Sequence, residues 1–265
     1  MKKWTTVLLL VLIIIRLYLP GLIRKPRFHM ESLDSMVEVW TYYETENGSE
    51  YGSGSGFVLS NSGSEVIIAT CEHVVEGEPK WINVIVNDEK YQAKVVRASE
   101  NADLAIISIE AELDIEPTTL SEAALFSTVY AAGYPGSKPY EQFIHHDKST
   151  GMAVTQGKVK YIIGGFSGKP FQIIHTAFED FGFSGGPLID WKSDIVGVAA
   201  FGNEDYYGAI SSWELMKLCK EIGVGYTHNF NFRLVKDLIT WVLIVLIIYR
   251  LIPDDNKENK ENKEK

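Results

Sequence analysis

Three residues that could together carry out acyl transfer occur in the order His73, Asp103 and Ser184. Ser184 lies in the stretch Gly182-Phe-Ser-Gly-Gly-Pro-Leu188, whose glycines permit backbone angles that a Cβ forbids. A sharp turn of this kind can expose a hydroxyl together with backbone N–H groups, which are the nucleophile and the oxyanion donors of acyl transfer. Taken alone, the stretch is equally consistent with an ordinary glycine-rich turn.

A candidate base and a candidate orienting acid precede this serine. His73 follows a strand-like segment in Thr70-Cys-Glu-His-Val-Val75, and Asp103 stands directly before the apolar segment 104–109. Taken singly, the histidine is typical of a structural or surface position and the aspartate of a turn. Taken with Ser184, the imidazole can accept and return the serine proton, and the acid can fix the imidazole tautomer.

The region that contains these residues is predicted to be all-β. Short segments rich in β-branched and aromatic residues alternate with turn signals, which is typical of a sandwich or a barrel. Turns are predicted at 47–49 and in the glycine-rich stretch 52–56, and a hairpin is predicted across 61–64. The predicted strands cover 37–43, 57–60, 65–70, 81–86, 91–96, 104–109, 128–132, 152–159, 172–176, 194–200 and 207–210.

One helix is predicted to follow these strands, over residues 211–222. Ser211 or Ser212 can cap its first turn. The apolar spacing places Trp213, Met216 and Cys219 on its inner face, with Leu215 and Ile222 as further candidates.

Two apolar segments flank the predicted β domain. Residues 4–23 are about the ~20 residues that a helix needs to cross a bilayer, and no Ala-x-Ala-like cleavage site follows, so residues 1–27 are predicted to be an uncleaved membrane anchor. Residues 234–252 are shorter, with aromatic and charged flanks that favour a second span over a buried or interfacial helix. Residues 253–265 form a charged tail that is predicted to be disordered.

Two spans would place both termini on one side of a membrane. Lys2, Lys3, Arg250 and the tail lysines favour an inside location for the termini, although basic residues at the other ends of both segments oppose it. The positive-inside rule therefore favours an extracytoplasmic domain between the spans.

The composition excludes some function classes. A net charge of −10 argues against a nucleic-acid partner, because phosphate binding calls for a basic surface. Cys71 and Cys219 are predicted to be free thiols rather than a disulfide. No Cys/His cluster has zinc spacing, and the pair His145-His146 is predicted to lie at the surface, so neither a metal nor another cofactor is expected.

Seven motifs in the chain, taken in order, resemble those of trypsin-like (chymotrypsin-fold) serine proteases, and within that group the HtrA/Deg-type branch. They run over about residues 36–222, which is the whole stretch between the apolar segments. The motifs are Gly52-Ser-Gly-Ser-Gly-Phe-Val-Leu-Ser60, Thr70-Cys-Glu-His-Val-Val75, Ala102-Asp-Leu-Ala-Ile106, Ala131-Ala-Gly-Tyr-Pro135, Gly182-Phe-Ser-Gly-Gly-Pro-Leu188, Ile195-Val-Gly-Val198 and Tyr207-Gly-Ala-Ile-Ser-Ser212.

The resemblance implies a protease domain over residues 36–225, built from two six-stranded antiparallel β-barrels that meet at the triad and a C-terminal helix. It assigns Ser184 as the nucleophile, His73 as the general base and acid, and Asp103 as the orienting acid. The backbone N–H groups of Gly182 and Ser184 would form the oxyanion hole. The implied activity is that of a serine endopeptidase that cleaves polypeptides through an acyl-enzyme.

The resemblance also implies a primary specificity pocket, whose candidate residues are Phe178, Glu179, Phe181, Ala199 and Phe201. Two acids in this region, at positions 179 and 180, would favour a basic residue before the scissile bond. The phenylalanines would instead leave a small apolar pocket, as in HtrA-type enzymes. Both readings stay open at the level of the sequence.

The sequence departs from the family pattern at Phe183, where relatives carry Asn or Asp. This residue argues against activation by a freed N-terminus and leaves the oxyanion loop to be positioned by packing.

Phe183 also supports one alternative function, a protease-fold protein with weak catalysis that is used for binding or as a chaperone. An esterase, which shares the chemistry of the triad, is a second alternative. A doubly wound α/β-hydrolase is disfavoured because its triad runs in the order serine, acid, histidine. No PDZ module follows, so regulation by one is not assumed.

Overall fold

The computed structural model describes residues 33–230, apart from 47, 137–140, 166–167 and 204, and also residue 242. The described residues up to Phe230 belong to one compact unit, Arg27–Phe230. The predicted spans at 4–23 and 234–252 and the tail at 253–265 lie outside the described residues, apart from Val242. Within the described part of the chain, no helix is both long and apolar enough to cross a membrane.

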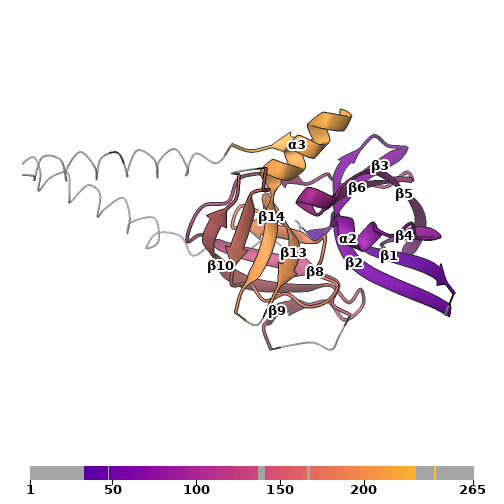
Figure 1. Ribbon diagram of the computed structural model, residues 1–265, viewed down its shortest axis with the longest axis horizontal. Helices are drawn as coiled ribbons and strands as arrows, with labels where there is room; N and C mark the ends of the chain where they lie inside the picture. Colours follow the sequence, from indigo (N-terminus) through magenta and orange to yellow (C-terminus); the bar gives the residue numbers. More distant parts are fainter. Residues whose placement is uncertain are drawn as a thin grey trace, which may run out of the picture. The chain divides into compact units, whose positions relative to one another are not determined.

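Six antiparallel strands close the first barrel (Figure 1). Its core comes from inward-facing aliphatic and aromatic residues such as Val39, Phe57 and Ile107, all fully buried. The alternation of buried and exposed positions along β1 is typical of strands with one face in a core. The strands pair in the order β1 (Met36–Thr45), β2 (Gly48–Asn61), β3 (Glu65–Thr70), β6 (Leu104–Glu110), β5 (Glu89–Ser99) and β4 (Trp81–Val86).

Six further antiparallel strands close a second barrel, because β12 pairs with both β8 and β13. Three short strands extend this sheet: β7 (Thr119–Leu120), β9 (Phe143–His146) and β15 (Thr227–His228). The ring runs in the order β12 (Pro187–Asp190), β8 (Thr128–Gly133), β10 (Ala153–Ile163), β11 (Gln172–His175), β14 (Tyr207–Ser211) and β13 (Ile195–Gly202). The predicted architecture of two six-stranded antiparallel barrels is confirmed.

The predicted C-terminal helix is confirmed as α3 (Ser212–Ile222). Ser211 caps it by accepting a hydrogen bond from the N–H of Trp213, and Gly223 ends it in the left-handed conformation. The inner face carries Leu215 and Cys219 as predicted. The prediction that Trp213 lies on the inner face is wrong, because this residue is 46% exposed. Trp213 lies about 100° around the helix axis from Ser212, which is buried against the barrel.

The glycine-rich stretch 52–56 is not a turn, contrary to the prediction, but the middle of strand β2. A Cβ on Gly54 would lie 2.8 Å from the methyl carbons of Val74, and one on Gly56 would lie 2.8 Å from the carbonyl oxygen of Ala69. The glycines therefore serve close packing against the segment that carries His73, rather than a change of chain direction. The hairpin predicted at 61–64 does join β2 to β3.

Candidate active site

His73 and Asp103 come together at one edge of the first barrel. His73 lies on α2 (Glu72–Val75), the single helical turn that follows β3, and Asp103 follows the short 3₁₀ helix η2 (Glu100–Ala102). Asp103 has left-handed backbone angles (φ 50°, ψ 49°), an uncommon conformation for a residue with a Cβ. Its two carboxylate oxygens both lie 2.9 Å from Nδ1 of His73, and Oδ1 also accepts the backbone N–H of His73 at 3.1 Å.

This pairing raises the pKa of the His73 imidazole. The hydrogen bond to Asp103 and the negative charge of its carboxylate favour the protonated ring, and they outweigh the opposing effect of partial burial. The same contact places a proton on Nδ1, so that the other ring nitrogen is left to act as a base. The side chains are 39% and 30% exposed, so the pair is open to a substrate from one side.

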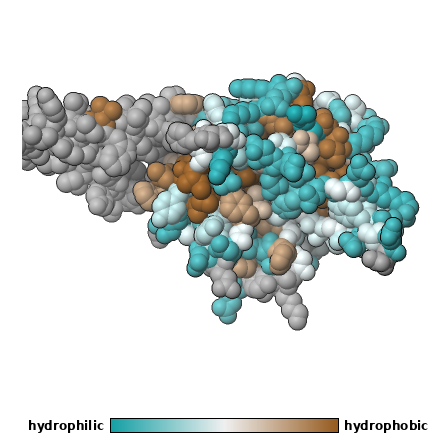
Figure 2. Space-filling model, viewed as in Figure 1, coloured by the Kyte–Doolittle hydropathy of each residue, from teal (hydrophilic) through white to brown (hydrophobic). Residues whose placement is uncertain are grey.

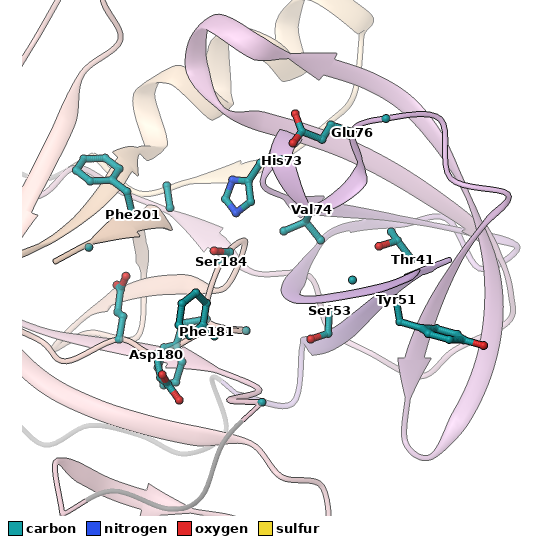
Figure 3. Close-up of a pocket in the computed structure, with 18 of the residues that line it drawn as sticks. Thr41, Tyr51, Ser53, His73, Val74, Glu76, Asp180, Phe181, Ser184 and Phe201 are labelled. Atoms are coloured by element: carbon teal, nitrogen blue, oxygen red, sulfur yellow. The ribbon is translucent and has the colours of Figure 1, made fainter. Parts of the chain in front are cut away.

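Ser184 lies beside this imidazole, in the loop that precedes β12 of the second barrel (Figure 3). His73 and Ser184 line the same cavity, which has a volume of about 1360 Å³. In Figure 3 the cavity extends to both sides of the two residues: Asp180, Phe181 and Phe201 lie on one side, and residues of β1 and β2 on the other. The structure thus brings the three predicted triad residues to the junction of the barrels.

The loop around Ser184 leaves two backbone donors without an acceptor. The N–H groups of Phe183, Gly185 and Gly186 donate to backbone carbonyls at 3.0, 2.8 and 2.8 Å. Those of Gly182 and Ser184 have no acceptor in the described part of the chain, and both residues line the cavity. Gly182 must be glycine here, because it has a φ of +95° and a Cβ would lie 2.2 Å from a backbone oxygen. Two free donors beside a hydroxyl can bind an oxyanion.

Ser55, in β2 of the first barrel, holds this loop. Its N–H donates to the carbonyl of Ser184 at 2.8 Å, and its Oγ donates to the carbonyl of Gly182 at 2.6 Å. The same Oγ accepts the N–H of Tyr134 at 2.9 Å, and Thr70 donates its hydroxyl to the carbonyl of Ser55 at 2.8 Å. Ser55 is fully buried. The prediction of a turn at 52–56 concealed this role, because only a strand places Ser55 against the second barrel.

Two further carbonyls of the loop are also fixed. Phe181 accepts the N–H of Gly136 at 3.0 Å, and Phe183 accepts that of Gly186 at 2.8 Å. Because C=O and N–H point in opposite directions across a trans peptide, these bonds also fix the directions of the N–H groups of Gly182 and Ser184. The donors are therefore oriented before any ligand arrives.

Phe183 anchors the loop in the core of the second barrel. It is 1% exposed, and its ring lies 6.1 Å from that of Phe143. A Cβ on Gly133 would lie 2.7 Å from the Cα of Phe183, so the glycine makes room for this residue. The packing of this side chain thus positions the loop that contains Ser184.

Three of the five predicted pocket residues line the cavity: Glu179, Phe181 and Phe201. Ala199 does not, because it is fully buried in β13, where its N–H donates to the carbonyl of Gly186. Phe178 does not line it either. Its ring packs edge-on against that of Tyr207, which does line the cavity, with centroids 5.6 Å apart.

Glu179 forms a buried pair with His175. Nε2 of the histidine lies 3.2 Å from Oε1 of the glutamate, and the side chains are 0% and 7% exposed. Burial raises the pKa of the Glu179 carboxyl, although the histidine opposes this effect. Glu179 is therefore a poorer anion for a substrate than its position on the cavity wall suggests.

The cavity has acidic groups on both sides of Ser184 and carries neither lysine nor arginine among its described lining residues. Glu50 and Glu76 contribute on the side of the first barrel, and Asp180 on the side of the second. Sequence reasoning missed the first-barrel wall: Glu50 and Glu76 belong to no motif, and the motifs that contain Gly52, Ser53 and Val74 gave no sign that these residues line a groove. Its members are Thr41, Tyr43, Glu50, Tyr51, Gly52, Ser53, Val74, Glu76 and Gly77.

Cys71, His73 and Asp103 are the one group of potential metal ligands in the part of the chain that the structure describes. The thiol of Cys71 is fully buried and donates to the carbonyl of Ala199 at 3.1 Å, and burial raises its pKa well above the ordinary value. A thiol must lose its proton to bind a metal. The raised pKa therefore favours the protonated thiol and its hydrogen bond to Ala199 over metal binding. Both cysteines are free, as predicted.

Replacing the carboxylate tests the electrostatics of the pair. In Asp103→Asn, we expect the pKa of His73 to fall, because the largest contribution that raises it is lost while the desolvation that lowers it remains. NMR titration of the His73 imidazole measures this. Glu76→Gln is the matched control and should lower the pKa by less, since Glu76 acts on His73 only through its charge. An unchanged pKa in Asp103→Asn contradicts the pairing.

Comparisons with known proteins agree with this geometry. A family model described as a trypsin-like peptidase domain matches residues 54–198, more than half of the chain. Serine protease HTRA4 of Homo sapiens is 30% identical over 150 residues, which are 55% of this chain and 29% of that protein. Chloroplastic protease Do-like 1 of Arabidopsis thaliana is 31% identical over 153 residues, 56% of this chain and 32% of that protein. The chain thus spans about a third of the length of these relatives.

Solved structures share the fold. The active form of the Rv3671c protease from M. tuberculosis superimposes with a TM-score of 0.58 at 23% identity, covering 74% of this chain and 84% of that one. Its inactive form gives a TM-score of 0.56 at 22% identity, covering 73% and 91%. Together with the family model and the HtrA-type relatives, these findings identify the chain as a member of the trypsin-like peptidase family.

Proposed function

We propose that this chain is a membrane-anchored serine endopeptidase that cleaves polypeptides through an acyl-enzyme. The observation that carries the proposal is the pairing of His73 with Asp103 beside Ser184, together with two backbone donors that have no acceptor among the described residues. An ordinary surface serine in a glycine-rich turn would not need an oriented imidazole beside it. It would also not need a loop in which the carbonyls of residues 181–184 all accept hydrogen bonds.

In the proposed mechanism, His73 takes the proton of the Ser184 hydroxyl as its oxygen attacks the substrate carbonyl. The imidazolium is stabilised by Asp103, whose carboxylate lies 2.9 Å from Nδ1. The oxyanion accepts hydrogen bonds from the N–H groups of Gly182 and Ser184. His73 then gives its proton to the leaving amine, and a water molecule, activated by the same imidazole, releases the acyl group.

The extent of the groove supports polypeptides over small esters. Side chains from both barrels line it on either side of Ser184, over a volume of about 1360 Å³, so it can accept an extended chain before and after the scissile bond. The alternative of a catalytically weak binding or chaperone-like protein rested on Phe183. Phe183 is buried in the core, and the loop that it anchors keeps two backbone donors without an acceptor among the described residues. This arrangement favours an active protease over a catalytically weak protein.

Membrane anchoring rests on the sequence. The apolar segments 4–23 and 234–252 flank the domain at both ends, and each has the composition of a spanning helix. The charges near the termini favour an extracytoplasmic protease domain. Substrates would then be polypeptides exposed close to that membrane face.

A fluorophosphonate probe tests the proposed nucleophile. We expect the full chain to be labelled at Ser184, because an activated serine attacks the phosphorus and the free donors stabilise the resulting oxygen. Ser184→Ala should abolish labelling, and Ser53→Ala, which removes another hydroxyl of the groove, should not. Mass spectrometry of the labelled peptide reads the site. A folded wild type that stays unlabelled, beside a labelled relative, contradicts the enzyme proposal.

Ser55→Ala tests how the oxyanion loop is held. The variant leaves the carbonyl of Gly182 and the N–H of Tyr134 without their partner. We expect kcat to fall about 10- to 100-fold with little change in KM, because misplaced donors act mainly on the transition state. Unfolding free energy should fall by about 1–3 kcal/mol.

Ser127→Ala is the matched control for that variant. Ser127 is also a buried serine, and its hydroxyl donates to a backbone carbonyl, that of Ala124, at 2.6 Å away from the groove. We expect Ser127→Ala to lower the free energy of unfolding by a similar amount and to leave kcat unchanged. Equal kcat values in the two variants would show that the contacts of Ser55 are structural only.

The charge of the groove predicts its substrate preference. Because acidic side chains line the groove on both sides of Ser184, we expect Lys or Arg to be favoured next to the scissile bond. Cleavage of a positional peptide library measures this. Asp180→Asn should reduce kcat/KM about five-fold for a basic residue before the bond, the effect of one partly solvated ion pair. A preference for small apolar residues that Asp180→Asn leaves unchanged contradicts the prediction.

A further inference from the structure

One face of the second barrel gathers exposed apolar side chains. Leu125, Phe126, Trp213 and Phe230 are 44%, 73%, 46% and 52% exposed. We name these four residues the apolar rim. Figure 2 shows apolar side chains on the side of this barrel that carries β10. Exposed groups of this kind, unlike scattered apolar residues, mark an interaction surface.

Hydrogen bonds place the members of the rim around one segment, Ser121–Phe126. Ser212, which precedes Trp213, donates its hydroxyl to the carbonyl of Ser121. Asn229, which precedes Phe230, donates its N–H to the carbonyl of Leu120 at 2.8 Å, and His228 pairs with Glu122 at 2.8 Å. The start of α3 and the end of the described chain therefore flank the segment that ends in Leu125 and Phe126.

Phe126 is held outward at a conformational cost. Its φ is +62°, a left-handed angle that is rare for a bulky side chain. Its N–H donates to the carbonyl of Val159 in β10 at 3.0 Å, which fixes the loop in this shape. The fold thus holds an aromatic ring in solvent at some conformational cost, which is a feature of surfaces that carry a function. Lys158 and Lys160, both exposed on β10, follow next to this loop.

The position of the rim along the chain identifies its partner. Only three residues, 231–233, separate Phe230 from the apolar segment 234–252. An extended chain advances at most about 3.6 Å per residue, so this link reaches no more than about 14 Å. If 234–252 spans a bilayer, Phe230 must lie within that distance of its surface. Trp and Phe side chains are suited to the interface, and the neighbouring lysines to anionic headgroups.

We propose that the apolar rim rests in the interfacial layer of the lipid bilayer and so fixes the orientation of the protease domain on the membrane. This inference rests on the membrane anchoring of the proposed function. A bilayer is the occupant that the short link requires, whereas a protein partner would have to fit between the rim and the lipid.

Depth-dependent quenching tests the inference in the full chain. Single reporters are introduced as Phe126→Cys and Trp213→Cys and labelled with an environment-sensitive dye; Cys71 and Cys219 are buried and stay unlabelled. Tyr51→Cys is the control, because Tyr51 is 64% exposed on the hairpin of β1 and β2, at the far end of the molecule from β10 (Figure 1). The variants are reconstituted into phosphatidylcholine and phosphatidylglycerol vesicles that carry a nitroxide near the headgroup.

We expect the nitroxide to quench the dye at positions 126 and 213 at least two-fold more than at position 51. Vesicle flotation of the same samples separates the inference from the anchoring. If the chains float but quenching is equal at all three positions, the proposal that the apolar rim rests in the bilayer is wrong and the anchoring still holds. Chains that do not float contradict the anchoring and the rim together. Fluorophosphonate labelling of the Phe126→Cys and Trp213→Cys samples, whose altered residues lie outside the groove, reports on the protease proposal independently.

Discussion

The hydrogen bonds of Ser55 join the two halves of the active site. Each barrel has its own closed set of strands: His73 and Asp103 lie at the edge of the first, and the loop with the N–H groups of Gly182 and Ser184 belongs to the second. Ser55 extends from the first barrel and holds the carbonyls of Gly182 and Ser184 in the second. These bonds hold the loop on the C-terminal side of Gly182 and of Ser184. The carbonyls of Phe181 and Phe183, which accept the N–H groups of Gly136 and Gly186, lie in the same rigid peptide groups as the N–H groups of Gly182 and Ser184 and so orient them. The chemistry of the site therefore depends on contacts across the junction of the barrels.

Several neighbouring contacts make this junction stiff. The thiol of Cys71 crosses it to the carbonyl of Ala199, which also accepts the N–H of Gly185. Phe183 secures the loop from the other side by filling the core of the second barrel. Glycines at 54 and 182 allow the backbones to approach to distances that a Cβ would prevent. The loop is thus ordered by packing and buried hydrogen bonds rather than by a charge at position 183.

The sequence predicted the parts of this site that follow from local pattern. The alternation of β1, the hairpin at 61–64 and the cap at Ser211 all concern neighbours in the chain, and the structure has them. The order of His73, Asp103 and Ser184 pointed to a shared site through the family resemblance. Ser55 could not be found in this way, because glycines on both sides of it are typical of a turn and its partners in the second barrel lie about 80 to 130 positions later.

The exposure of Trp213 was not predicted, and neither were the places of Phe178 and Ala199 outside the lining of the cavity. A position near a motif does not determine what a side chain contacts: the ring of Phe178, for example, packs against that of Tyr207. The acidic wall from the first barrel also escaped prediction. Glu50 and Glu76 reach the groove only because β2 and α2 lie beside the loop of Ser184. Such facts depend on tertiary packing, which no single stretch of sequence encodes.

A crystal structure of the chain with a peptidyl phosphonate bound to Ser184 would test the central claim most directly. The account predicts that the phosphonyl oxygen accepts the N–H groups of both Gly182 and Ser184, with the contacts of Ser55 and the burial of Phe183 unchanged. An oxygen that faces solvent, or a loop that must leave the contacts of Ser55 to reach it, would contradict the claim that the junction of the barrels preorganises the site.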